Sequence, residues 1–209
     1  MSLSRKKVKT KQRNWKRLFF ILLSVNLVII GSVCLFFLWP TKPLNLPKSE
    51  INSNDRYSEF TIRTSKENVN ELVNAYLDNL LRKTEHHYQI SLGEDVRLLG
   101  ELPVFSTKVP LSVRLEPEVQ PNGDIVLKQK SISLGLLELP NKQIMKYMKT
   151  FLPVPNWVYI DPNKEEIYVA VTEMDIKSNF RVKVETFDLT RNDINLNIQI
   201  PYESLGIED

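Results

Sequence analysis

The chain of 209 residues is long enough for one medium-sized domain with accessory segments. Apolar residues make up 42% and charged residues 25%, a normal globular mixture from which we expect most of the chain to fold. Residues 1–17 contain eight Lys and Arg and no acid, whereas residues 18–209 contain 20 Lys and Arg against 25 Asp and Glu, a net charge of −5. Because nucleic-acid binding needs basic residues clustered on the folded surface, this distribution argues against a nucleic-acid partner.

Residues 18–38, LFFILLSVNLVIIGSVCLFFL, predict a transmembrane helix. The segment has 21 residues without charge or proline, and a membrane-spanning helix needs about 20. Trp15 and Trp39 flank it, where amphipathic rings favour the headgroup level. The basic residues precede it, so we expect the N-terminus in the cytoplasm and residues 40–209 outside the cell. The predicted organisation is a basic cytoplasmic tail (1–17), a single-pass signal anchor (18–38), a spacer (39–56) and an extracytoplasmic domain (57–209).

Three other interpretations of this segment are open. A cleaved signal peptide has a shorter apolar core and a small-residue cleavage site, neither of which is present. A lipidated Cys34 requires a small residue before it, but Val33 precedes it and apolar residues follow. A buried soluble helix does not explain the flanking charge. Cys34 is the only cysteine, so we expect no disulfide and no thiol chemistry in the outer domain.

The domain that follows the spacer opens with a strand at 59–63 and an amphipathic helix at 65–83. Thr64 and Glu67 have the spacing of a capping box that starts the helix. Apolar residues then recur at the spacing of one helical stripe: Val69, Leu72, Val73, Tyr76, Leu77, Leu80 and Leu81.

From residue 86 onward the pattern changes to strands. Residues 107–119 alternate apolar and polar, residues 120–124 form a turn, and residues 125–139 return as the opposite arm. Pro110 and Pro117 predict that the first arm is an edge strand or is bent. A second helix is expected at 141–152, followed by strands near 157–161, 166–174, 179–189 and 194–201.

These elements predict an α+β domain. One-sided alternation gives each strand a wet face and an apolar face, and the helices must cover the apolar face. We therefore expect a curved, long-stranded antiparallel sheet that wraps the amphipathic helix and a second short helix, behind one N-terminal transmembrane helix.

The sequence offers little chemistry. His86 and His87 are the only histidines, and adjacent side chains point in different directions, which makes a shared metal ion difficult. Six glycines form no phosphate-binding loop, and no nucleophile motif is present. The close acids at 93–95 and 116–118 are typical of solvated turns. We expect no catalytic residues, no metal, no cofactor and no enzyme.

Residues 131–153, SISLGLLELPNKQIMKYMKTFLP, permit two interpretations. The strand is either central and buried on both faces, or one of its faces lines an elongated ligand cavity. Methionines of the following helix suit both, since they fill core gaps and also line adaptable apolar sites. Gly135 permits a bend within the strand.

The chain contains the following features in this order: the basic N-terminus, the span, the spacer, the helix with NELVNAYL, the hairpin VPLSVRLEPEVQPNGDIVLKQKSISLGLLELP and the segment FLPVPNWVYIDPNKEEIYV. Together they resemble the YpmS family of uncharacterised membrane-anchored proteins from Gram-positive bacteria. The resemblance implies the topology and assigns no functional residue. More distantly, a long amphipathic helix against curled strands is similar to tubular lipid-binding modules, which is an analogy of fold alone.

The leading hypothesis is a membrane-anchored extracytoplasmic module that binds a lipid or another elongated apolar ligand of the cell envelope. The alternative is a non-enzymatic scaffold for an envelope enzyme or secretion component, marked by an exposed apolar patch near residues 151–157. The residues expected to line the ligand site are Leu72, Tyr76, Leu80, Ile132, Leu134, Leu136, Met145 and Met148.

Overall fold

The computed structural model describes residues 15–38, 56–84, 87–104, 107–135, 141–176 and 179–202, and Gly206. They fall into two units, within residues 1–41 and 42–209. The first unit contains helix α1, Trp15–Leu38, whose described side chains are 16, 17 and 19–32. Over the described residues, no helix combines the length and the apolar character that a membrane crossing needs. The predicted span stays a prediction, and the predicted spacer lies outside the described residues except for Arg56.

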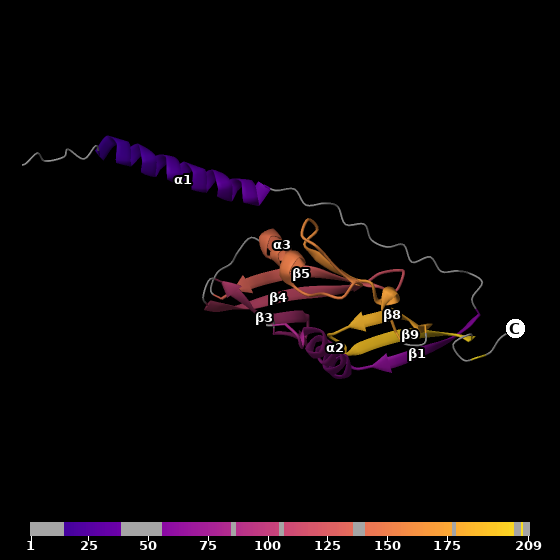
Figure 1. Cartoon of the computed structure of the whole chain (residues 1–209). Coiled ribbons are helices and arrows are strands. Elements are labelled where there is room, and N and C mark those ends of the chain that lie inside the picture. The colour runs from indigo at the N-terminus through magenta and orange to yellow at the C-terminus, as the bar shows by residue number, and fades with distance from the viewer. Residues whose placement is uncertain are drawn as a thin grey trace, which may run out of the picture. The chain divides into compact units, whose positions relative to one another are not determined.

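The second unit is an α+β domain, as predicted, with antiparallel strands (Figure 1). Its strands form two open sheets, of order β1-β9-β8 and β2-β3-β4-β5-β7-β6, so the expectation of one sheet is wrong. The elements are β1 (Tyr57–Thr64), α2 (Lys66–Leu81), β2 (Tyr88–Leu92), β3 (Val96–Val104), β4 (Thr107–Val119), β5 (Ile125–Leu134), α3 (Asn141–Phe151), β6 (Val158–Asp161), β7 (Glu166–Val169), the 3-10 helix η1 (Val171–Glu173), β8 (Arg181–Asp188) and β9 (Asp193–Pro201).

The two sheets meet where the β4–β5 turn touches β8. The Val184 N–H donates to the Gly123 carbonyl oxygen at 2.8 Å. Gly123 has φ +91°, and a Cβ there would lie 2.6 Å from the Lys183 Cβ. Only glycine therefore fits this turn against β8, which explains why the predicted turn at 120–124 contains one.

Strand β4 is central, lying between β3 and β5, so the edge-strand alternative expected from its prolines is wrong. Pro110 pairs with Glu101 and Pro117 with Leu127, and the register shifts once, between Arg114 and Leu115. The strand stays central because its apolar face, Leu111, Val113 and Leu115, is at most 2% exposed. Burial of that face outweighs the lost backbone donors.

The start of α2 differs from the capping box expected at Thr64. Ser65 is the N-cap, and its hydroxyl accepts from the Asn68 N–H at 3.4 Å. The side chain of Asn192, in the β8–β9 turn, accepts from the Lys66 N–H at 2.7 Å and donates to Glu67 at 3.2 Å. A long-range contact therefore replaces the local pair that the sequence pattern predicts.

Helix α2 also closes the outer edge of β2. The Asn74 side chain accepts from the Ile90 N–H at 2.9 Å and donates to the Ile90 carbonyl at 2.7 Å. Asn70 accepts from the Leu92 N–H at 3.0 Å. These amides take the place of a neighbouring strand, so β2 does not present a free pairing edge.

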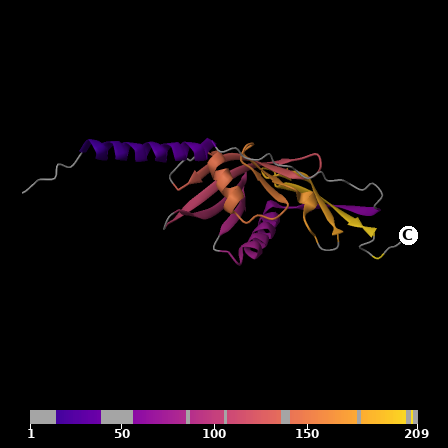
Figure 2. The same cartoon turned by 45° about the horizontal axis from the view of Figure 1, so that its top comes forward.

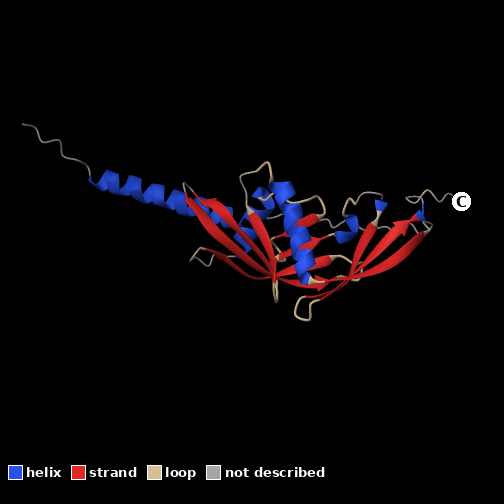
Figure 3. Cartoon of the chain, turned by 90° about the horizontal axis from the view of Figure 1, so that it is seen from below, coloured by secondary structure: helices blue, strands red, loops and turns tan. Residues whose placement is uncertain are grey.

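Both helices of this unit lie on the inner side of the curved strands (Figures 2 and 3). Helix α2 packs on β2 at one edge of the six-stranded sheet, and α3 packs on β6 and β5 towards the other. The main core lies between them and the sheet. Among the described residues, every buried apolar core side chain lies within residues 81–194, so we expect residues 42–209 to fold without α1.

Candidate functional site

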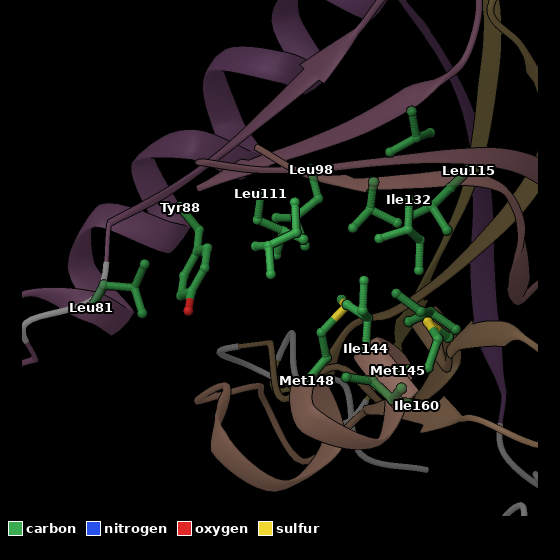
Figure 4. Packing of buried hydrophobic residues seen from close by; sticks show 14 of the residues in the cluster. Leu81, Tyr88, Leu98, Leu111, Leu115, Ile132, Ile144, Met145, Met148 and Ile160 are labelled. Atoms are coloured by element: carbon green, nitrogen blue, oxygen red, sulfur yellow. The ribbon is translucent and has the colours of Figure 1, made fainter. Parts of the chain in front are cut away.

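The floor of the candidate site is the apolar face of the six-stranded sheet. Side chains from β3, β4 and β5 point towards Ile144, Met145 and Met148 of α3 (Figure 4). Met145 and Met148 are fully buried, and Ile144 is 4% exposed. The methionine-rich helix therefore packs on the sheet as an apolar cover.

Helix α2 carries two apolar stripes rather than one. Val69, Leu77 and Leu81 pack into the core. Leu72 and Tyr76, one turn apart and beside that stripe, are 70% and 40% exposed. In that position the Leu72 side chain does not pack into the core, so the outer stripe faces solvent or a partner.

The outer stripe meets the connection between α3 and β6. The ring centroids of Tyr76 and Trp157 lie 5.8 Å apart in a tilted contact. On the same connection Val154 is exposed, and Phe151 at the end of α3 is 56% exposed. We call Leu72, Tyr76, Phe151, Val154 and Trp157 the apolar rim. Its two parts meet at the Tyr76–Trp157 contact.

An open depression of about 560 Å³ lies at the C-terminal end of α2. Its walls include Leu81 and Tyr88, which belong to the main core, and the partly exposed Leu99. The Tyr88 ring lies directly over Gly100, where a Cβ would come within 2.2 Å of the ring. Its volume falls within the range of ligand pockets.

One polar group inside the core is unexplained by the fold. Gln129 on β5 pairs in register with the buried Leu115, so its side chain shares the core-facing side of the sheet. Both of its amide atoms are out of solvent and have no hydrogen-bond partner among the described residues. The Gln143 Oε1 on α3 is in the same state. Unpartnered buried amides are costly and are normally satisfied by water or a ligand.

The structure divides the residues predicted to line a site. Ile132, Leu134, Met145 and Met148 lie together in the core, while Leu72 and Tyr76 lie on the rim. Leu80 is half-buried, and Leu136 lies outside the described residues. The ligand-binding role of all eight stays a prediction.

Within residues 131–153, the structure describes the strand Ser131–Leu134, whose side chains alternate between exposed and buried. This part of the strand is therefore buried on one face, and the expectation of burial on both faces is wrong for it. Residues 136–139 of the expected strand lie outside the described residues.

The acids interpreted as solvated turns differ from one another. Glu116 and Glu118 are exposed and pair with Lys130 and Lys128. Asp95 is instead 2% exposed, so the sequence interpretation is wrong for this residue. His87 is exposed, His86 is not described, and the described residues contain no group of three metal ligands.

Comparison with known proteins places the chain in a family. Residues 13–200 match the family of uncharacterized proteins conserved in bacteria known as DUF2140. The chain is also 30% identical to the uncharacterized protein YpmS of Bacillus subtilis (strain 168) over 188 residues. The aligned region covers 90% of this chain and 97% of that protein. The chain belongs to the YpmS family. No solved structure matches it. The matched residues 13–200 include the positions of the apolar rim and of the depression beside Tyr88.

Proposed function

We propose that this YpmS-family chain is a membrane-anchored module that binds an elongated apolar ligand of the cell envelope, such as the acyl chain of a lipid. The observation that carries the proposal is the apolar rim, where large side chains of α2 and of the α3–β6 connection stay exposed and meet through Tyr76 and Trp157. Exposed apolar side chains that gather on a surface typically mark an interaction site. The proposed role is binding, without a catalytic step.

The ligand chemistry follows from the surroundings of the rim. An acyl chain matches the apolar side chains of α2, α3 and the sheet, and Met145 and Met148 can adjust to its shape. A polar group partway along the ligand, such as an ester or amide, would satisfy the buried amide of Gln129. The depression beside Leu81 and Tyr88, at the C-terminal end of α2, would hold one end of the ligand. As in tubular lipid-binding modules, helices and a curled sheet would then enclose the chain lengthwise.

A charge on the rim is expected to weaken binding without unfolding the domain. Leu72→Lys places an ammonium group beside the ligand path, and because Leu72 is 70% exposed the fold should tolerate it. We expect the affinity for the fluorescent apolar probe N-phenyl-1-naphthylamine, measured on residues 42–209, to fall about tenfold. Asn79→Lys, on an exposed position of the same helix, is the matched control and should bind like the wild type. Equal affinities for the two variants, or no saturable binding by the wild type, would contradict the proposal.

The anchor in this proposal is residues 18–38 within α1. Their 21 uncharged residues and the basic residues before them support a single pass with the N-terminus in the cytoplasm. We expect the full-length chain to stay in the membrane pellet after an alkaline carbonate wash, and added protease to digest residues 42–209 on intact protoplasts. Release of the full-length chain by carbonate, or protection of residues 42–209, would contradict this orientation.

The scaffold hypothesis has one observation in its favour, because Phe151 and Val154 are exposed in the segment where a docking patch was expected. A photo-crosslinking residue at position 154 separates the two functions in cells. A scaffold gives one crosslinked protein of defined mass, whereas a ligand-binding module gives crosslinks to lipid.

A further inference from the structure

The outer edge of β1 is a long sheet edge that no described strand covers. β1 pairs with β9 along its whole length, and no described strand pairs with its other side. The edge of β2 is closed by the Asn70 and Asn74 side chains, β8 is joined to the β4–β5 turn, and β6 has just four residues. Six of the eight residues of β1 are exposed, and an exposed edge of this length is a template for pairing with another strand.

The two faces of β1 differ in character. Phe60 and Ile62 share a face with Ile198 and Leu196 of β9 and are 52% and 45% exposed. The other face carries Glu59, Thr61 and Arg63. An open edge with apolar residues on one face and opposite charges on the other has the composition of a strand-pairing surface.

We propose that β1 pairs antiparallel with β1 of a second copy of this chain, with Thr61 opposite Thr61 on the two-fold axis. In this register Glu59 lies opposite Arg63 of the second copy, and Phe60 lies opposite its Ile62. The Glu59–Arg63 ion pair and the Phe60–Ile62 apolar pair then each form twice, because a two-fold interface repeats each contact. The two three-stranded sheets become one sheet of six strands.

The charges select this register over its neighbours. A shift by one residue places the apolar residues opposite the polar face, and a shift by two places Thr61 opposite Glu59 or Arg63 and breaks both ion pairs. Within its own chain Glu59 accepts from the Gln199 side chain at 2.7 Å, and Arg63 pairs with Asp193 at 3.2 Å. These contacts hold both groups along the polar face, and the 74% exposure of the Arg63 side chain keeps it accessible from the edge.

Cysteine crosslinking of the full-length chain in membranes tests the pairing. Cys34→Ser removes the native cysteine, and Thr61→Cys then places two thiols opposite each other on the axis, within the Cα separation that a disulfide allows. We expect copper phenanthroline to convert Thr61→Cys to a dimer of twice the chain mass. Thr190→Cys, exposed in the β8–β9 turn, is the control for random collision and should stay monomeric.

The register has its own test. Glu59→Cys and Arg63→Cys should each crosslink weakly alone and strongly when expressed together. Arg63→Glu in the Thr61→Cys background should reduce the dimer at least about fivefold, since Glu59 then faces an acid. A Thr61→Cys chain that crosslinks no more than Thr190→Cys, or that forms a product of another mass, would overturn the proposal. This inference does not depend on the ligand.

Discussion

Replacing Asp124 by alanine is expected to lower the free energy of unfolding by about 3–5 kcal/mol. Asp124 is 2% exposed and follows the β4–β5 turn. Its Oδ2 accepts from the Tyr168 hydroxyl at 2.5 Å and from the Asn122 amide at 2.7 Å. Its Oδ1 accepts from the Thr172 N–H at 3.0 Å and from the Thr172 hydroxyl at 2.9 Å. Alanine leaves all four donors without this acceptor, in a place that water does not easily reach.

Urea unfolding of residues 42–209 measures this loss. Asp175→Ala removes an exposed carboxylate nearby and should change stability by less than about 0.5 kcal/mol. Burial, together with its hydrogen bond to Asp124, raises the pKa of Tyr168 to about 12, which agrees with a phenol held as a donor. A loss below about 1 kcal/mol for Asp124→Ala would show that the donors find other partners.

Replacing Asp95 by asparagine is expected to lower the free energy of unfolding by about 2–3 kcal/mol at pH 7. The Arg97 Nε donates to one carboxylate oxygen of Asp95 at 3.0 Å, and the Arg114 guanidinium donates to the other at 2.6 and 2.7 Å. Asparagine keeps the shape but loses the charge that both arginines face. We expect a smaller loss of stability than for a fully buried ion pair because both arginine side chains are 46% exposed.

The cost of Asp95→Asn should vanish in acid. Burial by itself raises the pKa of Asp95, but hydrogen bonds from Arg97 and Arg114 outweigh it and hold that pKa below its usual value. A carboxyl whose folded pKa is depressed contributes stability above its unfolded pKa of about 4 and loses it as the pH falls through the folded pKa. The unfolding curves of wild type and variant should therefore converge below about pH 4, whereas Glu94→Gln, on an exposed neighbour, should show no such change. A difference that persists unchanged to pH 2 would contradict this account.

Local patterns in the sequence predict most of the elements correctly. Alternation along 107–119 and 125–134, the turn between them, and the methionine-rich helix all depend on neighbouring residues, and the structure confirms them. Division into two sheets was not predictable in this way, because it depends on which distant strands pair. The docking of the β4–β5 turn on β8 through Gly123 is a contact across more than fifty residues of chain.

The site was predictable only in its apolar parts. Periodicity identified the buried Met145 and Met148 and also the stripe on α2, but it could not separate Leu72 from Leu77, since both fit one helical face. Asn70 and Asn74 look like an ordinary polar face, and their role appears when β2 lies beside them. Asp95 and Asp124 occur in turn-like sequence, and only tertiary contacts show that they are buried.

Native mass spectrometry of the domain after contact with its own membrane shows whether it binds a lipid there. A protease site placed between residues 39 and 55 of the full-length chain allows residues 56–209 to be released from membranes without detergent. We expect a species heavier than the polypeptide by the mass of one lipid, and a much smaller fraction of that species in the Leu72→Lys variant. A released domain that carries only its own polypeptide mass, in wild type and variant alike, would contradict it.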